Sequence, residues 1–106
     1  MPKYMIQGSF TREGIQGLLK EGGSSRKETL GKMLGDLGGS LESFYFAFGA
    51  DDVILIVELP DNATAAAVGM AVSATGAVGT RTTVLLTPEE VDTATHTSVG
   101  YRAPGA

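Results

Sequence analysis

Cysteine and tryptophan are both absent from this chain of 106 residues, and histidine occurs only once. Without cysteine there are no disulfides, thiolate metal sites or cysteine nucleophiles, and a reducing compartment is favoured. A single histidine excludes a multi-histidine metal site within one chain and makes a Ser-His-Asp triad hard to assemble. We therefore expect no metal site and no cofactor.

Long hydrophobic runs are missing as well. No stretch approaches the roughly 20 apolar residues of a membrane span, and the first residues lack the apolar core of a signal peptide. The net charge of −4 opposes binding to a phosphate backbone. These absences predict a cytoplasmic protein that binds neither membranes nor nucleic acid.

The charges are distributed unevenly along the chain. Residues 1–40 hold six Lys and Arg against four Asp and Glu, whereas residues 41–106 hold two against eight. This asymmetry is consistent with contact between unlike surfaces, within one subunit or between subunits. A chance distribution over solvated faces explains it equally well.

The stretch 40–59 contains two apolar runs joined at residues 49–52, and reads SLESFYFAFGADDVILIVEL. Apolar residues fill both alternating sets of positions, which predicts a β-hairpin with two apolar faces. An antiparallel sheet in a lone small domain commonly leaves one face polar. The second apolar face therefore predicts a partner subunit.

The segments before this hairpin predict a strand and two helices. Residues 3–10 alternate as a strand does, and Thr11 then caps a short helix that ends at the glycines 22–23. A second helix is expected to begin at Ser24 and Ser25, because Ser25 and Glu28 have capping-box spacing. Its apolar stripe should face the sheet, and the glycines 38–39 end it.

After the hairpin, Asp61 is the expected N-cap of an alanine-rich helix over 63–74, and residues 80–86 are rich in β-formers. The run Thr87-Pro88-Glu89-Glu90 is a helix start, with a helix to about residue 97 and an extended tail over 97–106. The order β-α-β-β-α-β plus a short C-terminal helix is the ferredoxin-like pattern. It predicts one α+β domain over 1–106, with a four-stranded antiparallel sheet in the order 4-1-3-2 and the helices on one face.

Several stretches resemble the GYD family of small, mostly uncharacterised bacterial proteins. They are PKYMIQGSFT, EGIQGLLKEGGSSR, LGGSLESFYFAFGADDVILIVELPD, the alanine-rich helix, LLTPEEVD and YRAPG, which together cover almost the whole chain. Gly49 and Asp52 match the signature that names the family, and Asp51 stands where its tyrosine is expected. The resemblance implies a ferredoxin-like subunit of the dimeric α/β-barrel type, and it implies no established reaction.

Tyr45, Asp52 and His96 are the best polar candidates for catalysis. His96 follows Asp92 by four residues on the predicted C-terminal helix, so the carboxylate can hold it as a general base. The alternative is a solvated histidine favoured by the helix dipole. Asp51 and Asp52 are candidates for paired acid–base carboxylates or for ligands of a divalent cation, although a polar hairpin turn explains them too.

Ser24, Ser25 and Arg26 form a candidate ligand-binding site for an anion, because hydroxyls, a cation and a helix N-terminus meet after two glycines. A plain helix start explains the same residues. The aromatic residues at 44, 45, 46 and 48 are expected either to line a ligand cavity or to supply core and interface.

Two functions follow from these observations. The first is a homodimer or higher homo-oligomer that binds a small molecule or a protein partner without catalysis. The second is a cofactor-independent oxygenase or isomerase, by analogy with other dimeric α/β-barrel families. A closed cavity with polar groups favours the enzyme, whereas the first function also tolerates a filled barrel.

Overall fold

A computed structural model describes the whole chain, residues 1–106. The elements are β1 (Lys3–Phe10), α1 (Arg12–Glu21), α2 (Gly23–Asp36), β2 (Ser40–Phe46), β3 (Val53–Glu58), α3 (Asn62–Ala74), β4 (Val78–Leu85) and α4 (Pro88–Thr95). None of the helices is long and apolar enough to cross a membrane.

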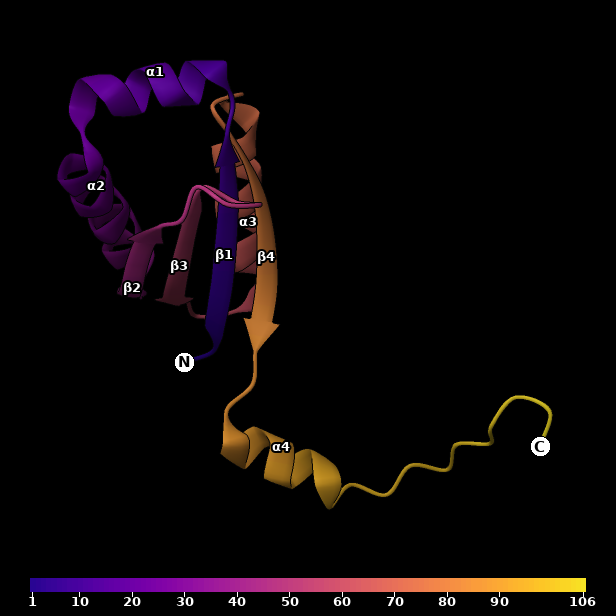
Figure 1. Cartoon of the computed structure of the whole chain (residues 1–106). Coiled ribbons are helices and arrows are strands. Elements are labelled where there is room, and N and C mark those ends of the chain that lie inside the picture. Colours follow the sequence, from indigo (N-terminus) through magenta and orange to yellow (C-terminus); the bar gives the residue numbers. More distant parts are fainter.

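The four strands form one antiparallel sheet in the order β2-β3-β1-β4. This is the predicted order 4-1-3-2 read from the opposite edge. Helices α1, α2 and α3 all lie on the same side of the sheet, which we call the helix face (Figure 1). The opposite side, which carries no helix, is the outer face. The predicted ferredoxin-like α+β fold is confirmed.

The core lies between the helix face and the helices, and the alternation of the strands determines its members. β1 contributes Tyr4 and Ile6, and β3 contributes Val53, Leu55 and Val57. The remaining buried members come from α2, the end of β3 and α3: Leu34, Leu59, Ala65 and Val68.

Three helices begin as the sequence predicts, through hydrogen bonds that span three residues. Thr11 Oγ1 accepts the N–H of Gly14 at 3.3 Å, and Asp61 Oδ1 accepts that of Thr64 at 2.8 Å. Thr87 and Glu90 form the complete capping box of α4. Each hydrogen bond satisfies a backbone donor that a helix start otherwise leaves open.

The predicted capping box of Ser25 and Glu28 is wrong. α2 begins at Gly23, its N-cap is Gly22, and no side chain caps it. Gly22 has a φ of 81° and donates its N–H to the carbonyl of Leu18 at 2.8 Å, so α1 ends and α2 starts at the same residue. The left-handed φ is open to glycine at little cost, and it places Ser25 already inside the first turn.

The hairpin differs from its prediction in the length of its loop. β2 ends at Phe46, so the connection runs from residue 47 to residue 52. Phe48 lies in this 47–52 loop with a φ of 52°, and its side chain is exposed. A register shift between Leu41 and Ser43 adds a β-bulge to β2.

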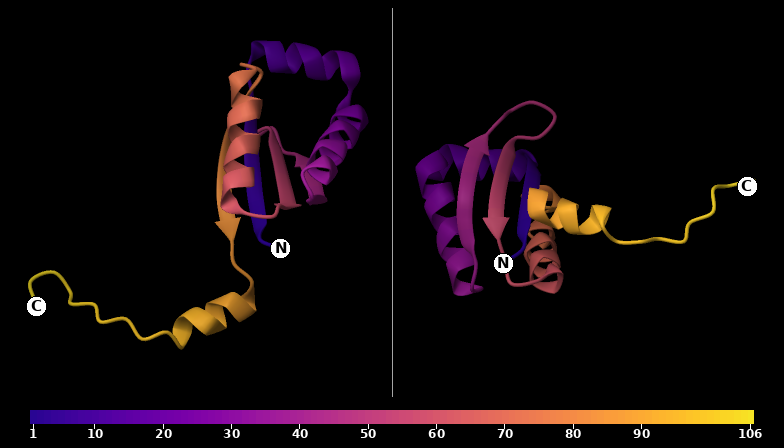
Figure 2. Two further views of the ribbon diagram at one scale, coloured as in Figure 1. Left: turned by 180° about the vertical axis from the view of Figure 1, so that it is seen from behind. Right: turned by 90° about the horizontal axis from the view of Figure 1, so that it is seen from below.

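Beyond β4 the chain projects away from the packed sheet and helices. α4 and the following residues extend from the end of the sheet, and none of their residues is buried (Figures 1 and 2). The radius of gyration is 16.9 Å, against about 13 Å for a compact domain of this length. The excess reflects this projecting segment.

Candidate ligand cavity

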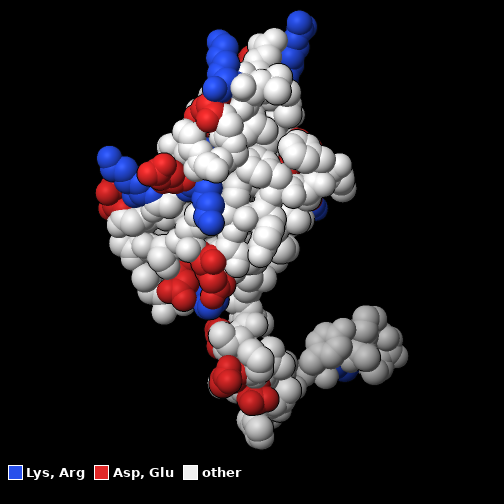
Figure 3. All heavy atoms as spheres, turned by 60° about the vertical axis from the view of Figure 1, so that its left-hand side comes forward, with Lys and Arg blue, Asp and Glu red and all other residues white.

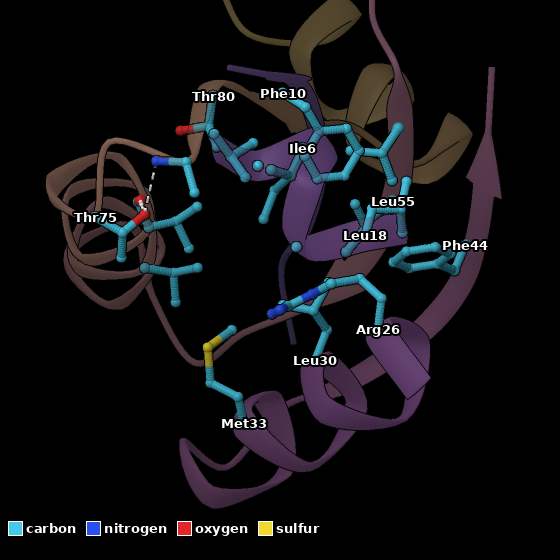
Figure 4. A pocket seen from close by; sticks show the side chains of 18 of the residues that line it. Ile6, Phe10, Leu18, Arg26, Leu30, Met33, Phe44, Leu55, Thr75 and Thr80 are labelled. Carbon is cyan, nitrogen blue, oxygen red and sulfur yellow. Dashed lines mark hydrogen bonds between the residues drawn. The ribbon is translucent and has the colours of Figure 1, made fainter. Parts of the chain in front are cut away.

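A cavity of about 350 Å³ lies between the helix face of the sheet and the helices α1, α2 and α3. Strand residues such as Ile6, Phe44 and Leu55 form its floor, and Leu18, Leu30 and Met33 approach it from α1 and α2 (Figure 4). Most of the lining is apolar. Its volume lies within the range of ordinary small-molecule sites.

The cavity exists because α1 meets the rest of the domain mainly at its first turn. There Gly14 packs so closely that a Cβ would lie 2.1 Å from the carbonyl oxygen of Ala77. The backbone N–H of Thr11 donates to the same oxygen at 2.9 Å. From this anchor α1 runs past the sheet to Gly22, where α2 turns back toward β2 (Figure 1).

Small residues leave the space unfilled. The face of α1 that lines the cavity is Glu13, Gly14, Gly17, Leu18 and Glu21, which share one side of the helix. A Cβ at Gly17 would meet nothing within 4 Å. Across the cavity, α3 presents Gly69. Interiors of folded domains are normally close-packed, so this gap is a specific feature of the fold.

Arg26 is the only cation that lines the cavity. Its guanidinium points into the space beside Leu30 (Figure 4). Nη1 donates to Oε1 of Glu21 at 3.2 Å, and each of the two side chains is 34% exposed. On the opposite side the hydroxyl of Thr75 donates to the carbonyl of Val72 at 2.7 Å and accepts the N–H of Ala77 at 3.1 Å.

The aromatic residues of the hairpin divide between two roles. Phe44 and Phe46 pack edge to face with ring centroids 5.1 Å apart, and Phe46 stacks on Phe10 at 6.5 Å. Phe44 and Phe10 line the cavity, whereas Phe46 does not. Phe48 is exposed, and Tyr45 is exposed on the outer face opposite Ile54.

Tyr45, Asp52 and His96 are not brought together within one chain. Asp52 lies at the start of β3 and His96 follows β4. These strands both run antiparallel to β1, so the two residues are at opposite ends of the sheet. None of the three lines the cavity. His96 Nδ1 lies 2.7 Å from the backbone oxygen of Asp92 rather than from its carboxylate.

Asp51 and Asp52 fasten the 47–52 loop to the sheet. Asp51 accepts hydrogen bonds from Gln7 at 3.0 Å and Ser9 at 3.4 Å, and it forms an ion pair with Arg81. Asp52 Oδ2 accepts the N–H of Phe10 at 2.8 Å. No group of three or more carboxylate and histidine side chains gathers into a metal-binding cluster.

The candidate anion site is divided by the structure. Ser24 and Ser25 are exposed on the first turn of α2, while Arg26 is turned into the cavity. A binding role for the two serines stays a prediction.

The sequence patterns did not identify Gly17, Met33 and Gly69 as cavity residues. The one signal was the pair of glycines in α1, which weaken a helix and leave its face bare.

Comparison with protein families gives a match to the GYD domain over residues 4–95. Apart from Lys3 at the start of β1, the match spans the sheet, the three packed helices and α4. Neither the curated proteins nor the solved structures include one that matches the chain.

Proposed function

Since the chain belongs to the GYD domain family, we propose that it binds a small, mainly apolar molecule in the cavity and acts as a homodimer or higher homo-oligomer. The observation that carries the proposal is the cavity itself, about 350 Å³ in a domain of 106 residues. A ligand that covers the apolar lining gains about 25 cal/mol of binding free energy for each Å² of apolar surface removed from water.

The outer face supports the proposed assembly. Met5 and Ile56 lie opposite each other at its centre, next to Ile54, and all three are only half-buried. Charged side chains flank them: Lys3 pairs with Glu42 and Glu58 at one end, and Arg81 pairs with Asp51 at the other. An apolar centre inside a polar rim is the usual anatomy of a protein interface.

A cofactor-independent oxygenase or isomerase is the second candidate. One observation favours it, namely that Glu13, Glu21 and Arg26 bring ionisable groups to the cavity. Against it, the cavity is partly open to solvent and none of Tyr45, Asp52 and His96 lines it. Binding without catalysis is therefore the better-supported function.

Filling the cavity tests the proposal. We expect the uncharged dye N-phenyl-1-naphthylamine to bind and to fluoresce more strongly, which is easy to follow because the chain has no tryptophan. Gly17→Leu places a side chain into the gap, and should weaken dye binding at least about tenfold, or 1.4 kcal/mol. Leucine favours a helix over glycine by up to about 1 kcal/mol, so Gly17→Leu should remain folded.

Gly35→Leu is the matched control. It makes the same change on α2, where a Cβ also meets nothing within 4 Å, but Gly35 does not line the cavity. Its dye affinity should equal that of the unmodified protein. The proposal fails if the dye does not bind, or if a folded Gly17→Leu variant binds it as tightly as Gly35→Leu does.

A further inference from the structure

Arg26 stands out among the cavity residues because its hydrogen-bonding capacity is largely unused. A guanidinium carries five N–H donors in a planar fork. In this chain the side chain of Arg26 makes one hydrogen bond, from Nη1 to Glu21. The guanidinium points into a space lined mostly by apolar groups, such as Leu18 and Leu30 (Figure 4). Donors in such surroundings gain most from a charged acceptor.

The start of α2 adds a second positive contribution at the same end of the cavity. No side chain caps this helix, and its first turn contains no acidic residue. The positive end of the helix dipole is therefore not neutralised from within α2. Arg26 itself belongs to this first turn, since its N–H donates to the carbonyl of Gly22 at 3.3 Å.

Glu21 holds Arg26 only loosely. The ion pair is a single hydrogen bond of 3.2 Å between side chains that are each one-third exposed. Pairs of this kind contribute little to stability, so an arriving anion can replace or share the contact at small cost. A carboxylate has the further advantage that it binds the two parallel N–H groups of the fork at once.

We infer that the ligand is an amphipathic carboxylate: its acidic group binds the guanidinium of Arg26 beside the start of α2, and its apolar part fills the cavity toward Met33 and Val72. This inference rests on the proposed function. It assigns the acid to the α2 end because Arg26, the one cation of the lining, lies there.

Three probes of equal chain length test the inference: octanoate, octanol and octylamine. Each is titrated at pH 7 against the protein loaded with N-phenyl-1-naphthylamine, and displacement of the dye gives its affinity. We expect octanoate to bind about tenfold more tightly than octanol, and octylamine to bind no better than octanol. Arg26→Met keeps a long unbranched side chain but removes the guanidinium, and should abolish the preference for octanoate.

Two further cavity variants and one control variant extend the test. Glu21→Gln releases Arg26 from its partner and should tighten octanoate binding without changing octanol. Arg26→Lys keeps the charge but loses the fork, and should give an intermediate preference. Lys27→Met is the control, because Lys27 is an exposed cation next to Arg26 that does not line the cavity. It should match the unmodified protein.

The outcomes separate the inference from the function on which it rests. Dye binding with equal affinity for octanoate and octanol overturns the inference and leaves the proposed function standing. A preference for octylamine overturns it too, since the acidic residues then select the ligand. An unchanged octanoate preference in folded Arg26→Met would place the anion elsewhere, and this result also overturns the inference. Failure of the dye to bind overturns both.

Discussion

The two neighbouring carboxylates Asp51 and Asp52 act on different parts of the sheet. Asp51 is 12% exposed at its side chain and joins Gln7, Ser9 and Arg81, which come from β1 and β4. Asp52 instead binds the backbone at the end of β1. Together they draw the 47–52 loop across the outer face, in front of β1 (Figure 1). This geometry supports a structural role for the pair.

Replacing Asp52 distinguishes that role from a part in ligand binding. Asp52→Ala removes the charged acceptor of the Phe10 N–H, and should lower the free energy of unfolding by about 1.5–3 kcal/mol. Asp52→Asn retains an acceptor and should cost less. Urea unfolding measures both. A fully stable Asp52→Ala variant that no longer binds the dye would instead assign Asp52 to the ligand site.

At the scale of single residues, the sequence predicts hydrogen bonds between residues that are close together in the chain. The caps at Thr11, Asp61 and Thr87 were predictable because each is a hydrogen bond across three residues. The inward direction of Arg26 was not, since it depends on Gly22 turning the chain by its left-handed φ and on how far α1 stands from the sheet. Both are properties of the tertiary structure.

Among the elements, α4 is the one without a surface to pack against. It is eight residues long and has no buried residue, and a helix of that length is marginal in water even with good caps. Leu86, Val91 and Tyr101 are exposed in and around it. The same segment is acidic, through Glu89, Glu90 and Asp92 (Figure 3). We propose that this segment packs on another copy of the chain.

Removing the tail tests this packing. Deletion of residues 97–106 should shift the protein toward smaller species while changing the unfolding free energy little, because the deleted residues are all exposed. Light scattering after gel filtration gives the mass. The full-length variant with Tyr101→Ala and Arg102→Ala should show a weaker effect in the same direction. An oligomer mass that is unchanged by the deletion would contradict the packing.

The elements also show where sequence patterns are insufficient. The strand order followed from the element order because right-handed crossovers leave few alternatives. The position of α1 did not follow from its pattern. Ile15, Leu18 and Leu19 have helical spacing, yet Leu19 is 81% exposed. The close contact of Gly14 with Ala77 sets the direction of the helix, and no local pattern encodes a contact across more than 60 residues.

For the molecule as a whole, the core is thin. Only 11 of 106 residues are buried, and every hydrophobic member of that core lies on or toward the helix face. No helix covers the outer face (Figure 2). Packing this face against that of a second copy would bury the apolar residues of both at once, as a two-fold interface does.

Ile56→Asp tests the assembly. A carboxylate at the centre of the outer face should split the oligomer, since burying it unpaired costs far more than the roughly 1.5–3 kcal/mol gained from isoleucine. Ala66→Asp places the same charge on an exposed position of α3 and should leave the mass unchanged. If the unmodified protein scatters light as a stable monomer of 10.9 kDa at micromolar concentration, the proposed assembly is wrong.

The central position of β1 in the sheet constrains how the domain folds during synthesis. β1 precedes the other strands in the chain, yet it lies between β3 and β4, and its partners are residues 53–58 and 78–85. Contacts so distant in sequence close slowly, whereas the β2–β3 hairpin forms across a six-residue loop. During synthesis β1 therefore has both edges unpaired until β3 has emerged, and one edge unpaired until β4 has emerged, and over that interval its open edges can pair with wrong partners.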